Sequence, residues 1–325
     1  MSSRVKISLE DVAKKAIKVI IIGVGGGGDI GWAIPIINYL RLFKAKEFFI
    51  GEPGIGWWNI DGRIALGGFK IQIKDLDKYK RISKRLALID YDTKVINGAI
   101  KGMKLPQSIV AELMKTKSFI LELDEGVDGM VEELKMFIKK EKIDLIIGVD
   151  CGSDSFYSGV ETKVLSPLVD AMVVAMLARL DIPSVLSLIG YGCDGDLMPE
   201  ELDKSISLVM KKGGFLGARG LTPIDIEYME KFFNMFPNPV EEWPLKAAKG
   251  ELGWKRMNEL WSIKISPFTS IMLFFDPKIL LEHNPLAKKI LYSKSLKEAE
   301  NITLKLGLIP ETRMVKLLPS LLEGE

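Results

Sequence analysis

Short apolar runs rich in Ile, Val and Phe alternate along this chain with longer segments whose apolar residues recur at helical spacing. Runs that are apolar at every position are typical of parallel strands covered on both faces of a sheet. The alternation therefore predicts a doubly wound α/β fold, a mostly parallel sheet with helices on both faces. The predicted strands span residues 18–23, 46–52, 118–123, 144–149 and 184–189.

Two helices are marked clearly by their patterns. Residues 127–138 carry apolar side chains at helical spacing, whereas Lys135 and Lys139 fall on the opposite side, so we expect one apolar stripe against the sheet. The run 167–180 is apolar all round and predicts a buried core helix. It is too short to span a bilayer and carries Asp170, so a membrane role is not expected.

The last hundred residues differ in character. Residues 223–325 read as helix-rich, and Thr222 before Pro223, like Ser295 before Glu298, is a typical helix start. A strand pair is predicted at 259–265 and 269–275. We expect a single domain over 1–325, in which 223–325 either continues the sheet or forms a subdomain or cap. The stretch 53–76, with Trp57 and Trp58, is either a functional loop or hides short strands.

Composition and charge limit the class of protein to which this chain can belong and the cell compartment in which we expect it. The 325 residues are 47% hydrophobic and carry a net charge of +2, which does not suit a nucleic-acid-binding protein. The N-terminus lacks a secretory signal, so a cytoplasmic location is expected. Scarce glutamine beside abundant lysine and isoleucine suits a thermophile. Cys151 and Cys193 form no disulfide framework; free thiols are the default and a bond between them is the alternative.

The first predicted strand runs into the glycine-rich stretch KVIIIGVGGGGDIGW, residues 18–32. Gly23 to Gly28 match G-x-G-x-x-G, and Glu52 ends the next strand, as in a dinucleotide site where an acid holds the ribose. In a phosphate site, Gly25, Gly26, Gly27 and Gly28 would present backbone N–H groups. Asp29, however, places a carboxylate where phosphate would lie, and the two would repel unless a metal ion lay between them.

Asp29 has an alternative interpretation as a helix N-cap, the commonest role of such a residue. Pro35 weakens this, because a helix starting at Ile30 would place the proline beyond its first turn.

The motif repeats. DLIIGVDCGSD (144–154) and SVLSLIGYGCDGD (184–196) are also apolar strands that break into loops of glycine and aspartate. Loops after parallel strands emerge at one edge of the sheet, where α/β proteins bind ligands. We therefore expect these aspartates to converge, with Asp170 pointing to the same edge. The converging residues would be Asp29, Asp150, Asp154, Asp194 and Asp196.

These residues define the predicted site. Asp29, Asp154 and Asp194 are the candidate catalytic residues, and Asp150, Asp154 and Asp196 the candidate metal ligands. Carboxylate oxygens suit Mg²⁺ or Mn²⁺, whereas zinc prefers more nitrogen and sulfur than one histidine and two cysteines supply. Candidate ligand-binding positions complete the set: the four glycines, Glu52, Gly152, Ser153 and Arg219. His283 is expected in a helix–helix turn, and no P-loop, G-x-S-x-G or H-E-x-x-H motif is present.

Several of these stretches resemble the uncharacterised archaeal and bacterial domain-of-unknown-function family 1152. The resemblance rests on GVGGGGDI, IIGVDCGSD, ETKVLSPLVDAM, GYGCDGDLMPEEL, IMLFFDP and NPLAKKILYSKSLKEAENITLKLG, which together extend over nearly the whole chain. It implies a Rossmann-like fold and no established activity. One departure occurs: where Gly-Gly-Asp is expected after the fourth strand, this chain has Gly152-Ser153-Asp154, which keeps the aspartate.

Three functions follow as hypotheses. The first is an enzyme that acts on a nucleotide or other phosphorylated small molecule, with Mg²⁺ or Mn²⁺ at the aspartates. The second is an NAD(P)-type binder that uses Glu52. The third is a non-catalytic homo-oligomeric scaffold whose interface includes Trp57 and Trp58.

Overall fold

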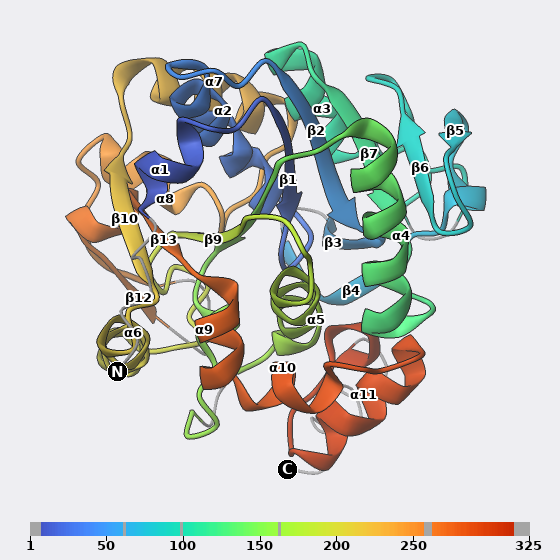
Figure 1. The fold of residues 1–325 in the computed structure, drawn as a ribbon. Helices are drawn as coiled ribbons and strands as arrows, with labels where there is room; N and C mark the ends of the chain where they lie inside the picture. The colour runs from blue at the N-terminus through green and yellow to red at the C-terminus, as the bar shows by residue number, and fades with distance from the viewer. Residues whose placement is uncertain (1–7, 61–62, 98–99, 162–163, 257–261, 315–325) are drawn as a thin grey trace.

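The computed structural model describes residues 8–60, 63–97, 100–161, 164–256 and 262–314. A nine-stranded sheet runs through the molecule in the order β10-β13-β9-β8-β1-β2-β7-β6-β5 (Figure 1). Its parallel centre confirms the five predicted strands to within two residues at each end: β1 (Lys18–Gly23), β2 (Glu47–Pro53), β7 (Lys117–Leu121), β8 (Leu145–Cys151) and β9 (Ser184–Ile189).

Antiparallel strands complete both edges of the sheet. Beyond β7 lie β6 (Leu86–Ile89) and β5 (Tyr79–Arg81). Beyond β9 lie β13 (Ile271–Phe275) and β10 (Phe215–Gly220). The chain passes from β1 to β2 on one side and later returns to place β8 on the other side. The crevice between the carboxyl ends of β1 and β8 is therefore the switch point at which doubly wound proteins bind ligands.

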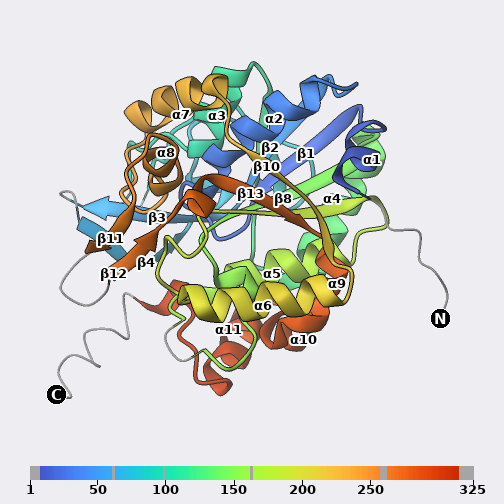
Figure 2. The same cartoon turned by 90° about the vertical axis from the view of Figure 1, so that its left-hand side faces the viewer.

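Helices cover both faces of the sheet, as Figure 2 shows. Because side chains alternate along a strand, Val19 and Ile21 of β1 pack into one hydrophobic core and Ile20 and Ile22 into the other. The first core includes residues of α1 (Leu9–Ala13), α2 (Ala33–Arg41), α3 (Pro106–Met114), α7 (Pro223–Met235) and α8 (Trp243–Ala248). The second includes residues of α4 (Gly126–Glu141), α5 (Pro167–Ala178), α6 (Pro199–Lys211), α9 (Pro277–His283), α10 (Pro285–Ile290) and α11 (Leu296–Lys305).

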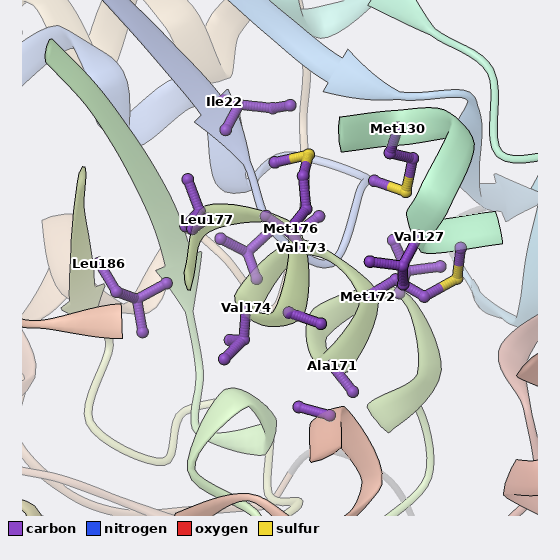
Figure 3. Packing of buried hydrophobic residues seen from close by; sticks show 14 of the residues in the cluster. Ile22, Val127, Met130, Ala171, Met172, Val173, Val174, Met176, Leu177 and Leu186 are labelled. Atoms are coloured by element: carbon purple, nitrogen blue, oxygen red, sulfur yellow. The ribbon is translucent and has the colours of Figure 1, made fainter. Parts of the chain in front are cut away.

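Helices α4 and α5 have the predicted character. In α4 the apolar stripe is buried and Lys135 and Lys139 are exposed. Every residue of α5 from Pro167 to Leu177 is buried, and Figure 3 shows its apolar side chains packed on all sides, against the sheet and α4. Within the described part of the chain, no helix has the length and apolar character to cross a membrane.

The structure resolves two open points of the sequence pattern. Within 53–76, short strands are present: β3 (Ile55–Ile60) and β4 (Arg63–Lys70) form an antiparallel hairpin. The predicted pairing of 259–265 with 269–275 is wrong, because β12 (Ser262–Ile265) pairs with β11 (Gly253–Arg256) while β13 joins the main sheet. Residues 259–261 of that prediction lie outside the described residues.

Candidate functional site

The loops that follow β1, β8 and β9 meet at the carboxyl edge of the sheet. These three strands are adjacent and parallel, so each chain reversal occurs at the same edge. The loop after β8 continues through a 3-10 turn, η3 (Asp154–Phe156), and leads into α5, whose first turn contains Asp170. The expected convergence of aspartates is observed here.

Five aspartates from these segments make up what we call the carboxylate cluster. One oxygen from each of Asp150, Asp154 and Asp170 lies within 4.8 Å of the others, and Asp154, Asp194 and Asp196 form a second group of the same kind. Asp154 belongs to both groups. Asp194 is partly exposed, whereas the other four are buried, so the cluster approaches solvent through Asp194.

Serine hydroxyls orient the carboxylates. Ser166, the N-cap residue of α5, donates to Oδ2 of Asp154 at 3.1 Å and to Oδ2 of Asp196 at 3.2 Å. Ser153 donates to Oδ1 of Asp194 at 2.8 Å, and its own oxygen accepts the Leu197 N–H at 3.0 Å. Ser153, which the sequence marked as a ligand-binding candidate, thus positions Asp194 in this structure.

Gly152 supplies the space that Asp194 occupies. A Cβ atom at position 152 would lie 2.3 Å from Oδ2 of Asp194 and 3.0 Å from its Cβ. No side chain fits there while Asp194 stays in place. Gly152, also predicted to bind ligand, therefore has a visible packing role.

Asp29 ties two of the loops together. Its Oδ2 accepts the Gly25 N–H at 2.8 Å and its Oδ1 accepts the Cys151 N–H at 3.1 Å. It begins the 3-10 turn η1 (Asp29–Trp32), and α2 starts only at Ala33, which leaves Pro35 within the first helical turn. Asp29 therefore bridges the glycine turn and the end of β8, and its carboxylate lies beside Gly25 together with that of Asp170.

All five aspartates of the carboxylate cluster have raised pKa values. Burial raises the pKa of Asp150 to about 7, and the nearby charge of Asp194 adds to the shift. Burial, followed by the charges of Asp170 and Asp196, raises the pKa of Asp154 well above its ordinary value. Burial and the charges of Asp150 and Asp29 do the same for Asp170. The pKa values of Asp194 and Asp196 are raised mainly by burial.

Compensating groups from the protein are few. Across the described ranges, no lysine, arginine or histidine forms an ion pair with any member of the cluster. Oδ1 of Asp170, a residue only 2% exposed, has no hydrogen-bond partner among the described residues. A buried carboxylate oxygen without a partner is unfavourable unless a ligand completes it.

The glycine turn beside the cluster is tightly packed. Gly26 and Gly27 have positive φ angles of 84° and 79°, a conformation that favours glycine. A Cβ at Gly26 would lie 2.6 Å from the Ile55 side chain, and one at Gly28 only 1.6 Å from Oε2 of Glu241. The turn is thus covered by β3 on one side and by Glu241 on the other.

Glu241 is a buried acid that the sequence reasoning missed. It lies between α7 and α8, and Trp32 donates its indole N–H to the Glu241 carbonyl at 3.1 Å. Burial raises the pKa of its carboxyl to about 8, and Oε2 has no hydrogen-bond partner in the described structure. Its stretch, NPVEEWP, contained only a proline-rich loop signal, which points to no acid in particular.

Glu52 is the last residue but one of β2, next to its predicted end, and its carboxyl is buried. The residue is 3% exposed, and its Oε1 lies 3.0 Å from the point where a Cβ of Gly23 would be. Burial and the charges of Asp29 and Glu241 raise its pKa well above the ordinary value. Glu52 also lines a small, largely apolar pocket with Gly27, Ile55 and Gln107.

The candidate Arg219, and His283 of the predicted helix–helix turn, lie apart from the carboxylate cluster. Arg219 is on β10, at the edge of the sheet, where its guanidinium pairs with Asp225 at 2.7 Å. Arg219 therefore belongs to a structural ion pair. His283 ends α9 and contacts the Ser205 hydroxyl through Nε2 at 2.5 Å.

Cys151 and Cys193 are free and buried. Their sulfur atoms are 3.9 Å apart.

Comparison with known proteins gives one match. The family model described as "Protein of unknown function (DUF1152)" matches residues 20–317. Neither the curated proteins nor the solved structures include a significant match to this chain.

Proposed function

This chain belongs to the DUF1152 family, whose description assigns no reaction, and from its site we propose a divalent-cation-dependent enzyme that acts on a small phosphorylated or nucleotide-like ligand. The observation that carries the proposal is the carboxylate cluster at the switch point of the sheet. Its aspartates come from three separate segments, and Oδ1 of Asp170 has no partner in the described structure. Such an arrangement is unfavourable for folding unless the carboxylates are protonated or a cation binds them.

The donor set indicates which cation to expect. The two groups offer carboxylate oxygens, the hard ligands that suit Mg²⁺, Mn²⁺ or Ca²⁺ rather than zinc. The cysteines nearby are buried, with their sulfur atoms directed at one another. Bound at Asp150, Asp154 and Asp170, a divalent cation would offset negative charge and polarise an oxygen of a phosphoryl or carbonyl group.

Partly exposed Asp194 is the best-placed group to meet a ligand. It lies at the solvent side of the cluster, and Ser153 holds its orientation. We assign it the role of accepting a proton from a bound water or hydroxyl group. Asp154 and Asp150 are assigned to the cation. Asp29 is assigned to holding the glycine turn, since both of its oxygens accept backbone N–H groups.

Backbone donors for ligand oxygens are available in the glycine turn. The Gly25 N–H donates to the Asp29 carboxylate, and the Gly28 N–H donates to the Glu241 carboxyl group. For Gly26 and Gly27, the described structure records no acceptor of the backbone N–H. Gly27 also lines the small pocket next to Glu52.

The two other hypotheses have less support. A ribose role for Glu52 requires an accessible carboxylate, and this one is buried under the glycine turn. The scaffold hypothesis relied on Trp57 and Trp58, which lie on β3 with side chains outside the described part of the structure. The cation-dependent enzyme therefore accounts for more of the described geometry.

Thermal unfolding of the full chain tests the proposal. We expect Mg²⁺ or Mn²⁺ to raise the melting temperature, because a ligand at 100 times its dissociation constant stabilises by about 2.7 kcal/mol. Asp154→Asn should abolish the shift. Asp181→Asn, on an exposed carboxylate paired with Lys135, is the matched control and should keep it.

The same assay separates the ligand classes. With Mg²⁺ present, ADP or inorganic phosphate should raise the melting temperature further, whereas NAD⁺ should not. A wild-type protein that is indifferent to Mg²⁺ and Mn²⁺ would remove the basis of the proposal. A shift with NAD⁺ in the absence of metal would favour the dinucleotide hypothesis instead.

A further inference from the structure

We infer that the carboxylate cluster holds two divalent cations, with Asp154 as the carboxylate that bridges them. This inference rests on the proposed function and specifies its metal centre. One ion would lie among Asp150, Asp154 and Asp170, and the other among Asp154, Asp194 and Asp196. Asp194 would bind its ion through one oxygen and keep the other oxygen to accept the proton. Two-ion centres of this kind serve reactions in which an attacking and a leaving oxygen both need stabilisation, above all the hydrolysis or transfer of phosphoryl groups.

The spacing of the oxygens fits two ions. In each group the three oxygens lie within 4.8 Å of one another. Two ligands on opposite sides of one ion are about 4.2 Å apart for Mg²⁺ and about 4.8 Å apart for Ca²⁺. Each group is therefore compact enough for its three oxygens to bind one ion. The two groups share only Asp154, so they define two centres that have one side chain in common.

The charge of the cluster also favours two ions. Five carboxylates gather there, and none has an ion-pair partner within the described ranges. When metal binding has displaced the protons of all five carboxylates, one divalent cation offsets two of their negative charges and two cations offset four. The N-terminus of α5 points its first turn at the cluster and adds a further favourable field, although too small to replace an ion.

The serine hydrogen bonds also distinguish the two groups of aspartates. Ser155 holds Asp150, and Ser153 holds Asp194, so the two outer parts of the cluster have separate supports. Ser166 contacts both Asp154 and Asp196 and fixes the shared side of the cluster. Asp170 Oδ1 has no protein partner in the described structure, which marks the first group as incomplete without a ligand.

Counting bound metal tests the inference. We expect isothermal titration with Mn²⁺ to give two ions per wild-type chain, and close Mn²⁺ pairs to broaden the electron paramagnetic resonance spectrum. Asp170→Asn should remove the first ion, and Asp196→Asn the second, so each variant should bind one ion and lose the pair broadening. Asp154→Asn should lose both ions. The Asp181→Asn control should bind two.

The outcomes separate this inference from the proposed function. One Mn²⁺ per wild-type chain, lost equally in Asp170→Asn and Asp196→Asn, would overturn the two-ion centre and leave a single-cation enzyme standing. No Mn²⁺ or Mg²⁺ binding by the wild type would overturn both. If a variant fails to fold, the stoichiometry and spectrum of the wild type still decide between one ion and two.

Discussion

At the scale of single residues, the Asp194 carboxylate can keep its position only because residue 152 is a glycine. Gly152 leaves room for the Asp194 carboxylate, and Ser153 then holds that carboxylate by a hydrogen bond. The φ angle of Gly152 is outside the left-handed region, so the requirement for glycine is steric. A substitution at this position therefore reports on packing alone.

Gly152→Ala should destabilise the metal-free protein by about 1–3 kcal/mol, because the new methyl group forces Asp194 to move. Gly220→Ala is the matched control: it lies on β10, and its Cβ would meet nothing within 4 Å. Urea unfolding of both variants measures the difference. Equal stabilities of the two variants would contradict the prediction. The double variant Gly152→Ala/Asp194→Ala should recover part of the loss.

The site residues that lie at the ends of apolar strands could be predicted from the sequence. Asp150 lies near the end of β8, the other three aspartates follow β8 or β9, and loops after parallel strands must meet at one edge. These three are Asp154, Asp194 and Asp196. Glu241 was not predictable, because it reaches the glycine turn from a loop more than two hundred residues away. Arg219 lies in a glycine-rich segment, yet its partner is Asp225, only six residues away. Local composition does not tell whether such a residue contacts a distant segment, as Glu241 does, or a neighbour in the sequence, as Arg219 does.

At the scale of elements, the start of α5 depends on the far end of the chain. Glu311 accepts the Leu168 N–H at 3.1 Å and the Val169 N–H at 2.6 Å. Both are among the first N–H groups of the helix, which have no partner within it. Since α5 also presents Asp170, Glu311 stabilises the element that carries one side of the cluster.

Glu311→Ala should lower the free energy of unfolding by about 1–3 kcal/mol, because it leaves two buried N–H groups without acceptors. Glu311→Gln, which retains one carbonyl oxygen, should lose less. Glu282→Ala, on an exposed side chain, is the control. Urea unfolding in the presence of a chelator gives the comparison. A Glu311→Ala variant as stable as Glu282→Ala would show that the cap contributes little.

The elements themselves were predictable to different degrees. The parallel strands are covered on both faces, so their sequences are uniformly apolar and their limits are clear. β12 and β13 are neighbours in the sequence, and proximity suggested a hairpin. Instead β13 pairs with β9 and β10, strands that come much earlier in the chain. A pairing of this kind depends on the whole fold and leaves no local signal.

At the scale of the whole molecule, the buried acids make stability depend on pH. Burial raises the pKa of Asp150 to about 7 and that of Glu241 to about 8, from ordinary values of 3.8 and 4.5. Between these limits the folded protein binds more protons than the unfolded chain. Its stability is therefore greatest at low pH within this range and falls as the pH rises through the folded pKa values.

In a chelator, the free energy of unfolding should decrease from pH 5 to pH 8, by about 1.4 kcal/mol per pH unit for each extra proton of the folded state. Mg²⁺ should counter this loss, and more so at high pH, because the ligands must release protons to bind metal. Urea unfolding at several pH values, with and without Mg²⁺, measures both effects. Metal-free stability that rises from pH 5 to pH 8 would contradict the prediction.

The position of β13 has a consequence for how the protein is made. Residues 271–275 lie between β9 and β10 in the finished sheet, although they are synthesised about fifty residues after β10. Until they leave the ribosome, β9 has an unpaired edge next to the loop that carries Asp194 and Asp196. A nascent chain therefore carries an unpaired strand edge beside the aspartate loop until β13 is made, and an unpaired strand edge of this kind is open to aggregation. Chaperone contact during synthesis would be most useful in that interval.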